Sequence, residues 1–201
     1  MTWSNNNHCW YNTNLATHNI LNSNFILPQE PLVQNLWKYR AEDIFSAEWI
    51  DYCEYNKIYL KGDVMLFYKA PYFNSYRAHV DVNSKDPVIQ HTTWALNWTI
   101  NNHTSEMVWY DIPANTPSFT PSKDPIYLEW DSRLLTPIDR KQITDHIVLC
   151  RVDVPHDIRL GNEPRWCISA RAWLGEGYDI MPEWSVVVER LNELKLIESR
   201  I

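Results

Sequence analysis

The sequence predicts a mainly β fold with a few flanking helices. After residue 56, short runs rich in Val, Ile, Tyr, Trp and Thr alternate with segments rich in Pro, Asn, Asp and Ser. The chain has 201 residues, of which 45% are hydrophobic and 21% charged, as in an ordinary globular protein. This length predicts one domain spanning 1–201. Many short strands with regular turn signals are typical of a sandwich, a barrel or a jelly roll.

Seven segments have the composition of strands: 64–69, 76–82, 92–100, 107–111, 126–130, 146–152 and 165–173. Residues 101–105, which read NNHTS, are expected to form a hairpin loop between two of them. Residues 113–125 contain four prolines and are expected to form a surface loop. The strand-rich part therefore runs from about 64 to 173.

Helical patterns lie at both ends of this core. Pro31 suits the first turn of a helix over 31–37, and Ser46 is a good N-cap for a helix over 46–55. Residues 182–200 have apolar residues at helical spacing and begin with Pro182. Residues 1–30, rich in Asn and Thr, are expected to form an irregular arm. The arm and helices of 1–56 and the helix of 182–200 then flank the core.

Charge and composition exclude several classes of protein. The net charge is −7 and no run of Lys and Arg exceeds two residues, so nucleic acid is an improbable partner. No apolar stretch approaches 18 residues, so no membrane span is expected. The four cysteines form no CxxC pair, and the N-terminus lacks the pattern of a signal peptide. These features predict reduced thiols and a cytoplasmic location.

One short motif, His79-Val80-Asp81, points to a metal site. Residues i and i+2 of a strand point to the same face, so the imidazole and the carboxylate would converge. A third ligand could be His156, which follows an apolar run. Two His and one carboxylate on one face of a metal are the ligand set of non-haem Fe(II) oxygenases. Arg165, nine residues after His156, has the fork geometry that binds a carboxylate.

With this order and spacing, the chain resembles the 2-oxoglutarate and Fe(II)-dependent dioxygenases over about 64–173. The phrase YRAHVD at 76–81 is similar to the prolyl-hydroxylase-like subgroup. The resemblance implies a double-stranded β-helix, or jelly roll of the cupin type, in which His79, Asp81 and His156 are the metal-binding and catalytic residues. It also implies co-substrate contacts from Arg165, Tyr68 and Asn97. The pocket for the substrate would be lined by Tyr76, Trp94 and Trp109.

The implied activity is oxidation of a C–H bond, with Fe(II) as cofactor and 2-oxoglutarate as co-substrate. The expected outcome is hydroxylation of a peptide or protein, an amino acid or another small molecule, with release of succinate and CO2. The arm of 1–30 and the loop of 113–125 would act as lids. Many family members have Arg-x-Ser, where this chain has Arg165-Trp166-Cys167, and Arg171 is a rival for the carboxylate role. The alternatives are a non-catalytic cupin-like binding module and a similar barrel that uses Mn, Ni or Zn.

Overall fold

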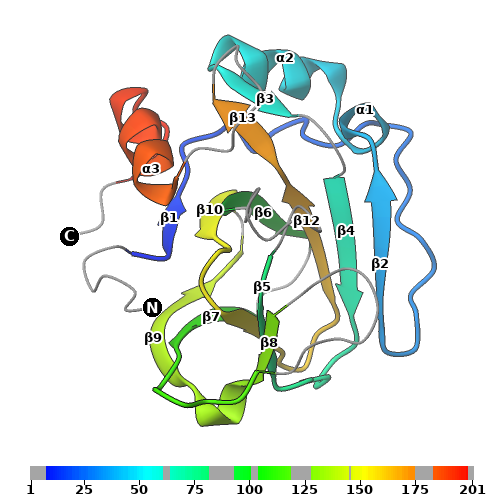
Figure 1. Cartoon of the computed structure of the whole chain (residues 1–201). Helices are drawn as coiled ribbons and strands as arrows, with labels where there is room; N and C mark the ends of the chain where they lie inside the picture. Colours follow the sequence, from blue (N-terminus) through cyan, green and yellow to red (C-terminus); the bar gives the residue numbers. More distant parts are fainter. Residues whose placement is uncertain are drawn as a thin grey trace.

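Two antiparallel β-sheets form the body of the molecule in this computed structural model (Figure 1), which describes residues 8–60, 64–81, 93–100, 104–118, 128–144, 146–174 and 183–198. Within these residues the larger sheet has the order β1 (Trp10–Asn12), β10 (Val148–Arg151), β6 (Trp94–Ile100), β12 (Arg165–Ala170), β4 (Val64–Lys69), β2 (Gln34–Tyr39). The smaller sheet has the order β8 (Leu128–Asp131), β5 (Arg77–Val80), β11 (His156–Arg159), β7 (Glu106–Asp111), β9 (Thr136–Gln142). A further pair joins β13 (Ala172–Leu174) to β3 (Ile58–Leu60). The prediction of a mainly β fold is confirmed.

From β4 to β7, and again from β9 to β12, successive strands alternate between the two sheets, whereas β7, β8 and β9 all belong to the smaller one. Strands β4, β6, β10 and β12 belong to the larger sheet, whereas β5, β7 and β11 belong to the smaller one. The predicted hairpin at 101–105 is therefore wrong, because β6 pairs with β10 and β12 while β7 pairs with β11 and β9. Residues 101–103 themselves lie outside the described residues. Turn residues in the sequence indicate that a strand ends, but they do not specify which strand it pairs with.

The two faces of the larger sheet meet different surroundings. Leu66 and Tyr68 of β4, with Trp166 and Ile168 of β12, belong to a core cluster shared with the helices. These are α1 (Ala41–Ile44), α2 (Ala47–Tyr55) and α3 (Trp184–Glu193), which Figure 1 places on the side away from β7, β8 and β9. The alternate residues of β4 and β12 face the smaller sheet. The space between the sheets therefore receives Lys69 and Arg165.

A second apolar cluster holds the two sheets together. Ala95 of β6 and Val148 and Cys150 of β10 pack against Met107 and Trp109 of β7. All of these residues are at most 2% exposed, so this end of the space between the sheets is filled. The polar side chains described below occupy the other end, near β5 and β4.

The helix predictions had mixed outcomes. Helix α2 begins after Ser46, whose Oγ accepts a hydrogen bond from the Trp49 N–H at 3.1 Å, as the N-cap pattern predicted. Helix α3 lies within the predicted 182–200. The helix predicted over 31–37 is wrong, because Gln34–Tyr39 is the edge strand β2. There it pairs with β4, and Trp37 stacks on Trp166 with ring centroids 5.5 Å apart, so tertiary packing overrides a weak helical spacing.

Sequence reasoning also missed several shorter elements. Strand β1 lies inside the predicted irregular arm and pairs with β10, while Leu15 and Ile20 of the same arm are buried in the core. Strands β3 and β9 were not predicted. All four cysteines are buried, and no disulfide joins any two of them, as expected. Among the described residues, no helix combines the length and the apolar character needed to cross a bilayer.

Candidate metal centre

Two histidines that are far apart in sequence lie opposite each other in the smaller sheet. His79 of β5 and His156 of β11 are directly paired residues of neighbouring antiparallel strands. Directly paired residues point to the same face of a sheet, and the two ring centroids are 4.6 Å apart. The pairing of β5 with β11 thus brings together the two imidazoles that the sequence predicted as ligands.

Asp81 completes the group one residue beyond the end of β5. Its backbone N–H donates to the Val152 carbonyl at 2.9 Å, which fixes the chain where it leaves the strand. Its Oδ1 lies 3.5 Å from Nε2 of His79 and 3.9 Å from Nε2 of His156. Atoms that share one ion at about 2.1 Å can be at most about 4.2 Å apart, so both separations suit a shared metal. All three ligand atoms lie within 4.8 Å of one another.

The ring of His156 is oriented for metal binding. Its Nδ1 lies 2.9 Å from the Val154 carbonyl oxygen, which can only accept a hydrogen bond, so Nδ1 carries the proton. The lone pair of Nε2 then faces Asp81. Burial, followed by the nearby imidazole of His79, lowers the pKa of His156 to about 4. The imidazole is therefore neutral at neutral pH, which is the form that binds a metal.

Arg171 anchors the carboxylate from its other side. Its Nη2 donates to Oδ2 of Asp81, and its Nη1 donates to Oγ of Ser169 at 2.8 Å. Burial would raise the pKa of Asp81, but the charge of Arg171 and the two imidazoles outweigh it and hold that pKa below its usual value. Asp81 is therefore ionised. Its Oδ2 accepts a hydrogen bond from Arg171, and its Oδ1 faces the two imidazoles. Arg171, predicted as a rival co-substrate ligand, instead holds the metal-site carboxylate.

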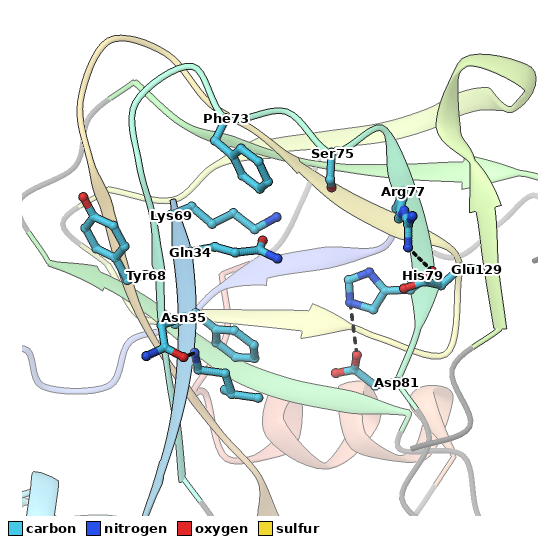
Figure 2. A pocket seen from close by; sticks show the side chains of 12 residues that line it. Gln34, Asn35, Tyr68, Lys69, Phe73, Ser75, Arg77, His79, Asp81 and Glu129 are labelled. Carbon is cyan, nitrogen blue, oxygen red and sulfur yellow. Dashed lines mark hydrogen bonds and ion pairs between the residues drawn. The ribbon is translucent and has the colours of Figure 1, made fainter. Parts of the chain in front are cut away.

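A cleft of about 820 Å³ opens beside the centre (Figure 2). His79 and Asp81 lie on one side of it, and Lys69 and Gln34 project into it from the larger sheet. The other lining residues are Asn35, Leu36, Phe67, Tyr68, Phe73, Ser75, Arg77 and Glu129. Arg77 and Glu129 pair with each other at 3.3 Å. The cleft is therefore polar near the centre, and it is large enough for small organic molecules.

Arg165 lies on the face of β12 that looks toward this space. It is only 4% exposed, and it is the direct partner of Lys69 in the pairing of β12 with β4. Among the described residues, no carboxylate or carbonyl accepts a hydrogen bond from its guanidinium. Although Arg165 follows His156 by only nine residues, the two do not lie on paired strands, since β11 and β12 belong to different sheets. Arg165 lies across the space between the sheets from the strands that carry the imidazoles.

Lys69 is a site residue that sequence reasoning missed. Its side chain points into the cleft toward the region of His79 (Figure 2). Burial, and then the charge of Arg165, lower the pKa of its amine to about 8. The sequence does show that Lys69 is a charged residue at the end of an apolar strand. Its role could not be predicted from this, because the prediction also requires knowing that the neighbouring strand carries Arg165.

Two predicted site residues lie on the wrong face of the larger sheet. Tyr68 packs against Trp166 with ring centroids 4.7 Å apart, and in Figure 2 it points away from His79 and Asp81. Trp94 is fully buried in the cluster that the sheet shares with the helices. Because strand residues alternate faces, both side chains point away from the face that carries Arg165, although Tyr68 borders the cleft. This placement gives no support to the predicted roles of Tyr68 and Trp94.

Tyr76, predicted to line the pocket, also points elsewhere. Its backbone has a φ of 52°, in the left-handed region. Its ring contacts two guanidinium groups, with the ring centroid 5.3 Å from Cζ of Arg133 and 5.1 Å from Cζ of Arg159. It is not among the residues that line the cleft. The prediction for Tyr76 is wrong because the left-handed turn directs its side chain away from the cleft.

Asn97 and Trp109, predicted to contact the co-substrate and to line the substrate pocket, lie in the space between the sheets but do not line the cleft. Asn97 is directly paired with Ser169, and its buried Oδ1 accepts no hydrogen bond from any described residue. Trp109 is the direct partner of His156 on β7, and its Nε1 donates to the Arg151 carbonyl at 2.6 Å. Trp109 is fully buried. It forms the wall behind His156 rather than a surface that a substrate could contact.

Comparisons of the chain with protein-family models, with curated proteins and with solved structures found no match.

Proposed function

We propose that the protein is a non-haem Fe(II) and 2-oxoglutarate-dependent dioxygenase. The observation that carries the proposal is the convergence of His79, Asp81 and His156 beside a cleft. Two imidazoles and one carboxylate oxygen suit Fe(II) and leave further coordination positions for a chelating 2-oxo acid and for dioxygen. When bound, the iron supplies activation of dioxygen coupled to conversion of 2-oxoglutarate to succinate and CO2.

The proposed fold is a double-stranded β-helix. Its support is the strand order, in which the strands from β4 to β7 and from β9 to β12 alternate between two facing antiparallel sheets. In this proposal the metal ligands and the residue that holds the co-substrate come from different sheets. His79 and His156 lie on the smaller sheet, and Arg165 lies on the larger one.

In this proposal each residue of the centre has one task. His79, Asp81 and His156 hold the metal, while Arg171 orients Asp81 so that only Oδ1 faces it. Arg165 binds the carboxylate of 2-oxoglutarate that is remote from the metal. The buried wall that includes Trp109 keeps water from the far side of the centre. The substrate would enter through the cleft and present a C–H bond near His79.

The class of substrate in this proposal is a peptide or protein, an amino acid or another small molecule. The cleft offers side-chain amides from Gln34 and Asn35 and aromatic rings from Phe67 and Phe73. Amides and aromatic rings suit a ligand with both peptide-like polar groups and apolar groups. Hydroxylation is the proposed outcome.

The test is an anaerobic titration of the purified protein with Fe(II) and then 2-oxoglutarate. We expect the weak visible metal-to-ligand charge-transfer band of the chelate to appear. It should be lost in His79→Ala and weakened in Arg165→Ala at limiting 2-oxoglutarate, but kept in His146→Ala, where an exposed histidine outside the centre is removed. Asp81→Ala should abolish succinate formation in air.

The same titration distinguishes the alternatives. Two His and one carboxylate also form zinc sites, so a protein that binds Zn²⁺ at these residues but gives no band with Fe(II) and 2-oxoglutarate would point to a different metal reaction. A protein that binds neither metal would point to a binding module. Either result would overturn the oxygenase proposal.

A further inference from the structure

The larger sheet presents a row of polar side chains to the space between the sheets. Gln34 of β2 is the direct partner of Lys69 of β4, which in turn is the direct partner of Arg165 of β12. Directly paired residues share a face, so all three side chains point the same way. Figure 2 shows Lys69 and Gln34 extending into the cleft toward the side that carries His79.

Two like charges lie side by side in this row. Arg165 is 4% exposed and lowers the pKa of Lys69, which places the two groups within electrostatic reach of each other. Neither cation makes an ion pair with a described residue; only a weaker, longer-range influence of Asp157 opposes the effect of Arg165 on Lys69. By contrast, Arg77 pairs with Glu129 and Arg171 pairs with Asp81. Within the described part of the chain, Lys69 at the cleft and its strand partner Arg165 are therefore two neighbouring cations without an ion-pair partner.

Such an arrangement is unfavourable unless an anion joins it. Burial of an unpaired charge costs several kcal/mol, and two adjacent cations add their mutual repulsion. An anion that contacts both groups removes both costs at once. A carboxylate has two oxygens and can accept from the guanidinium and from the ammonium simultaneously.

We propose that Lys69 and Arg165 together form a two-cation site for one carboxylate group, so that Lys69, which lies outside the family resemblance, selects a dicarboxylic acid as the metal-bound co-substrate. The inference rests on the proposed function in one respect. It assumes that the ligand held by this row of side chains also binds the metal and is a 2-oxo acid. Gln34, at the outer end of the row, adds an amide donor where the cleft opens.

The first test measures the binding of glutarate to protein without metal. Glutarate is a dicarboxylate that lacks the 2-oxo group needed to chelate iron. Isothermal titration calorimetry should give an affinity for glutarate that falls about tenfold or more in Lys69→Met. Lys69→Arg, which keeps the charge, should stay within a few-fold of the wild type. Lys141→Met is the matched control, because it removes the same charge from β9, the far edge strand of the smaller sheet.

The second test identifies the source of the carboxylate. With Fe(II) bound under anaerobic conditions, Lys69→Met should weaken 2-oxoglutarate about tenfold or more and leave 2-oxovalerate, which lacks the remote carboxylate, nearly unchanged. Equal affinity of wild type and Lys69→Met for both glutarate and 2-oxoglutarate would overturn the inference. An effect on glutarate without one on 2-oxoglutarate would also overturn it, because the carboxylate would then belong to a different ligand.

Failure of this inference and failure of the proposed function give different results. If the charge-transfer band forms equally well in Lys69→Met at limiting 2-oxoglutarate, the oxygenase proposal stands and the role of Lys69 does not. If no band forms in the wild type but glutarate binding depends on Lys69, the two cations do bind a carboxylate, but the iron chemistry and the role of Lys69 in selecting a metal-bound co-substrate both fail. Thermal unfolding of each variant checks that the protein remains folded.

Discussion

At the scale of single residues, the contacts of Asp81 decide what the centre can bind. A carboxylate between two imidazoles could turn either oxygen toward them, and Arg171 removes that freedom by holding Oδ2. Ser169 in turn holds Arg171. The direct ligands alone therefore do not define the geometry of the centre, because residues behind a ligand fix its orientation.

The role of Arg171 gives a prediction that separates it from Arg165. Arg171→Met should lower the affinity for Fe(II) or Mn(II) by about 10- to 100-fold, because Asp81 loses its fixed orientation. Arg165→Met should leave metal affinity nearly unchanged and weaken 2-oxoglutarate. Metal titration followed by calorimetry or by Mn(II) electron paramagnetic resonance measures the first effect without turnover. Unchanged metal affinity in Arg171→Met would contradict the role in orientation.

At the scale of elements, composition predicted the positions of most core strands. Strand β4 coincides with the predicted 64–69, and β5, β6, β7, β8 and β10 lie within one or two residues of their predicted ranges. The predicted 165–173 divides into β12 and β13. Composition identifies such segments because β-branched and aromatic residues suit a pleated, half-buried surface. It does not identify β2 or β9, whose residues are largely exposed.

The start of α2 offers a prediction about stability. Ser46 accepts a hydrogen bond from the Trp49 N–H through Oγ, and the same hydroxyl donates to the Asn19 carbonyl. Ser46→Ala should lower the free energy of unfolding by about 1 to 2 kcal/mol, since it removes an N-cap. Ser46→Asp, which can still cap the helix, should recover part of that loss. Urea denaturation followed by circular dichroism measures both, and equal stability of Ser46→Ala and wild type would contradict the capping role.

At the scale of the whole molecule, the buried cation Lys69 couples stability to pH. In the folded protein its pKa is about 8, below the 10.5 of an exposed lysine, so folding disfavours the charged form. Between about pH 8 and pH 10.5 the unfolded chain binds more protons than the folded one, and this contribution makes stability rise with pH. Below about pH 8 the full cost is present. The charges of Arg165 and Asp157 act on Lys69, and the other charged or imidazole side chains that line the cleft among the described residues are Arg77, Glu129, His79 and Asp81.

Lys69→Met should therefore stabilise the protein at neutral pH while it impairs ligand binding. The gain should be about 1 to 3 kcal/mol and should shrink toward zero as the pH rises to about 10.5. The measurement is urea denaturation of both proteins at several pH values, in which the difference cancels the titration of other groups. A variant less stable than the wild type at neutral pH would contradict this account of the buried charge.

Metal binding should also stabilise the whole molecule. A ligand that binds only the folded state adds RT ln(1 + [L]/Kd), or about 2.7 kcal/mol at a concentration 100 times Kd. Mn(II), a redox-stable substitute for Fe(II), should therefore raise the melting temperature of the wild type and of His146→Ala. It should leave that of His79→Ala unchanged. An equal rise in all three proteins would place the metal outside the centre.

The sequence alone predicted the strand-rich core, the capped helix α2 and the three residues that could bind a metal ion, His79, Asp81 and His156. These residues could be predicted because their chemistry is specific and because two of them lie two residues apart at the end of one strand, so local geometry brings them together. Local patterns also predicted the helix near the C-terminus.

Only the tertiary structure decided which side chains face the cleft. Adjacent strand residues point to opposite faces, and which face is buried under helices depends on packing between distant segments. For this reason Tyr68 and Trp94 pack beneath the helices, while Lys69, one residue after Tyr68, lies in the cleft. Arg171 pairs with Asp81, and Lys69 lies beside Arg165, because strand order in the sheets brings together residues that are 90 and 96 positions apart in the chain.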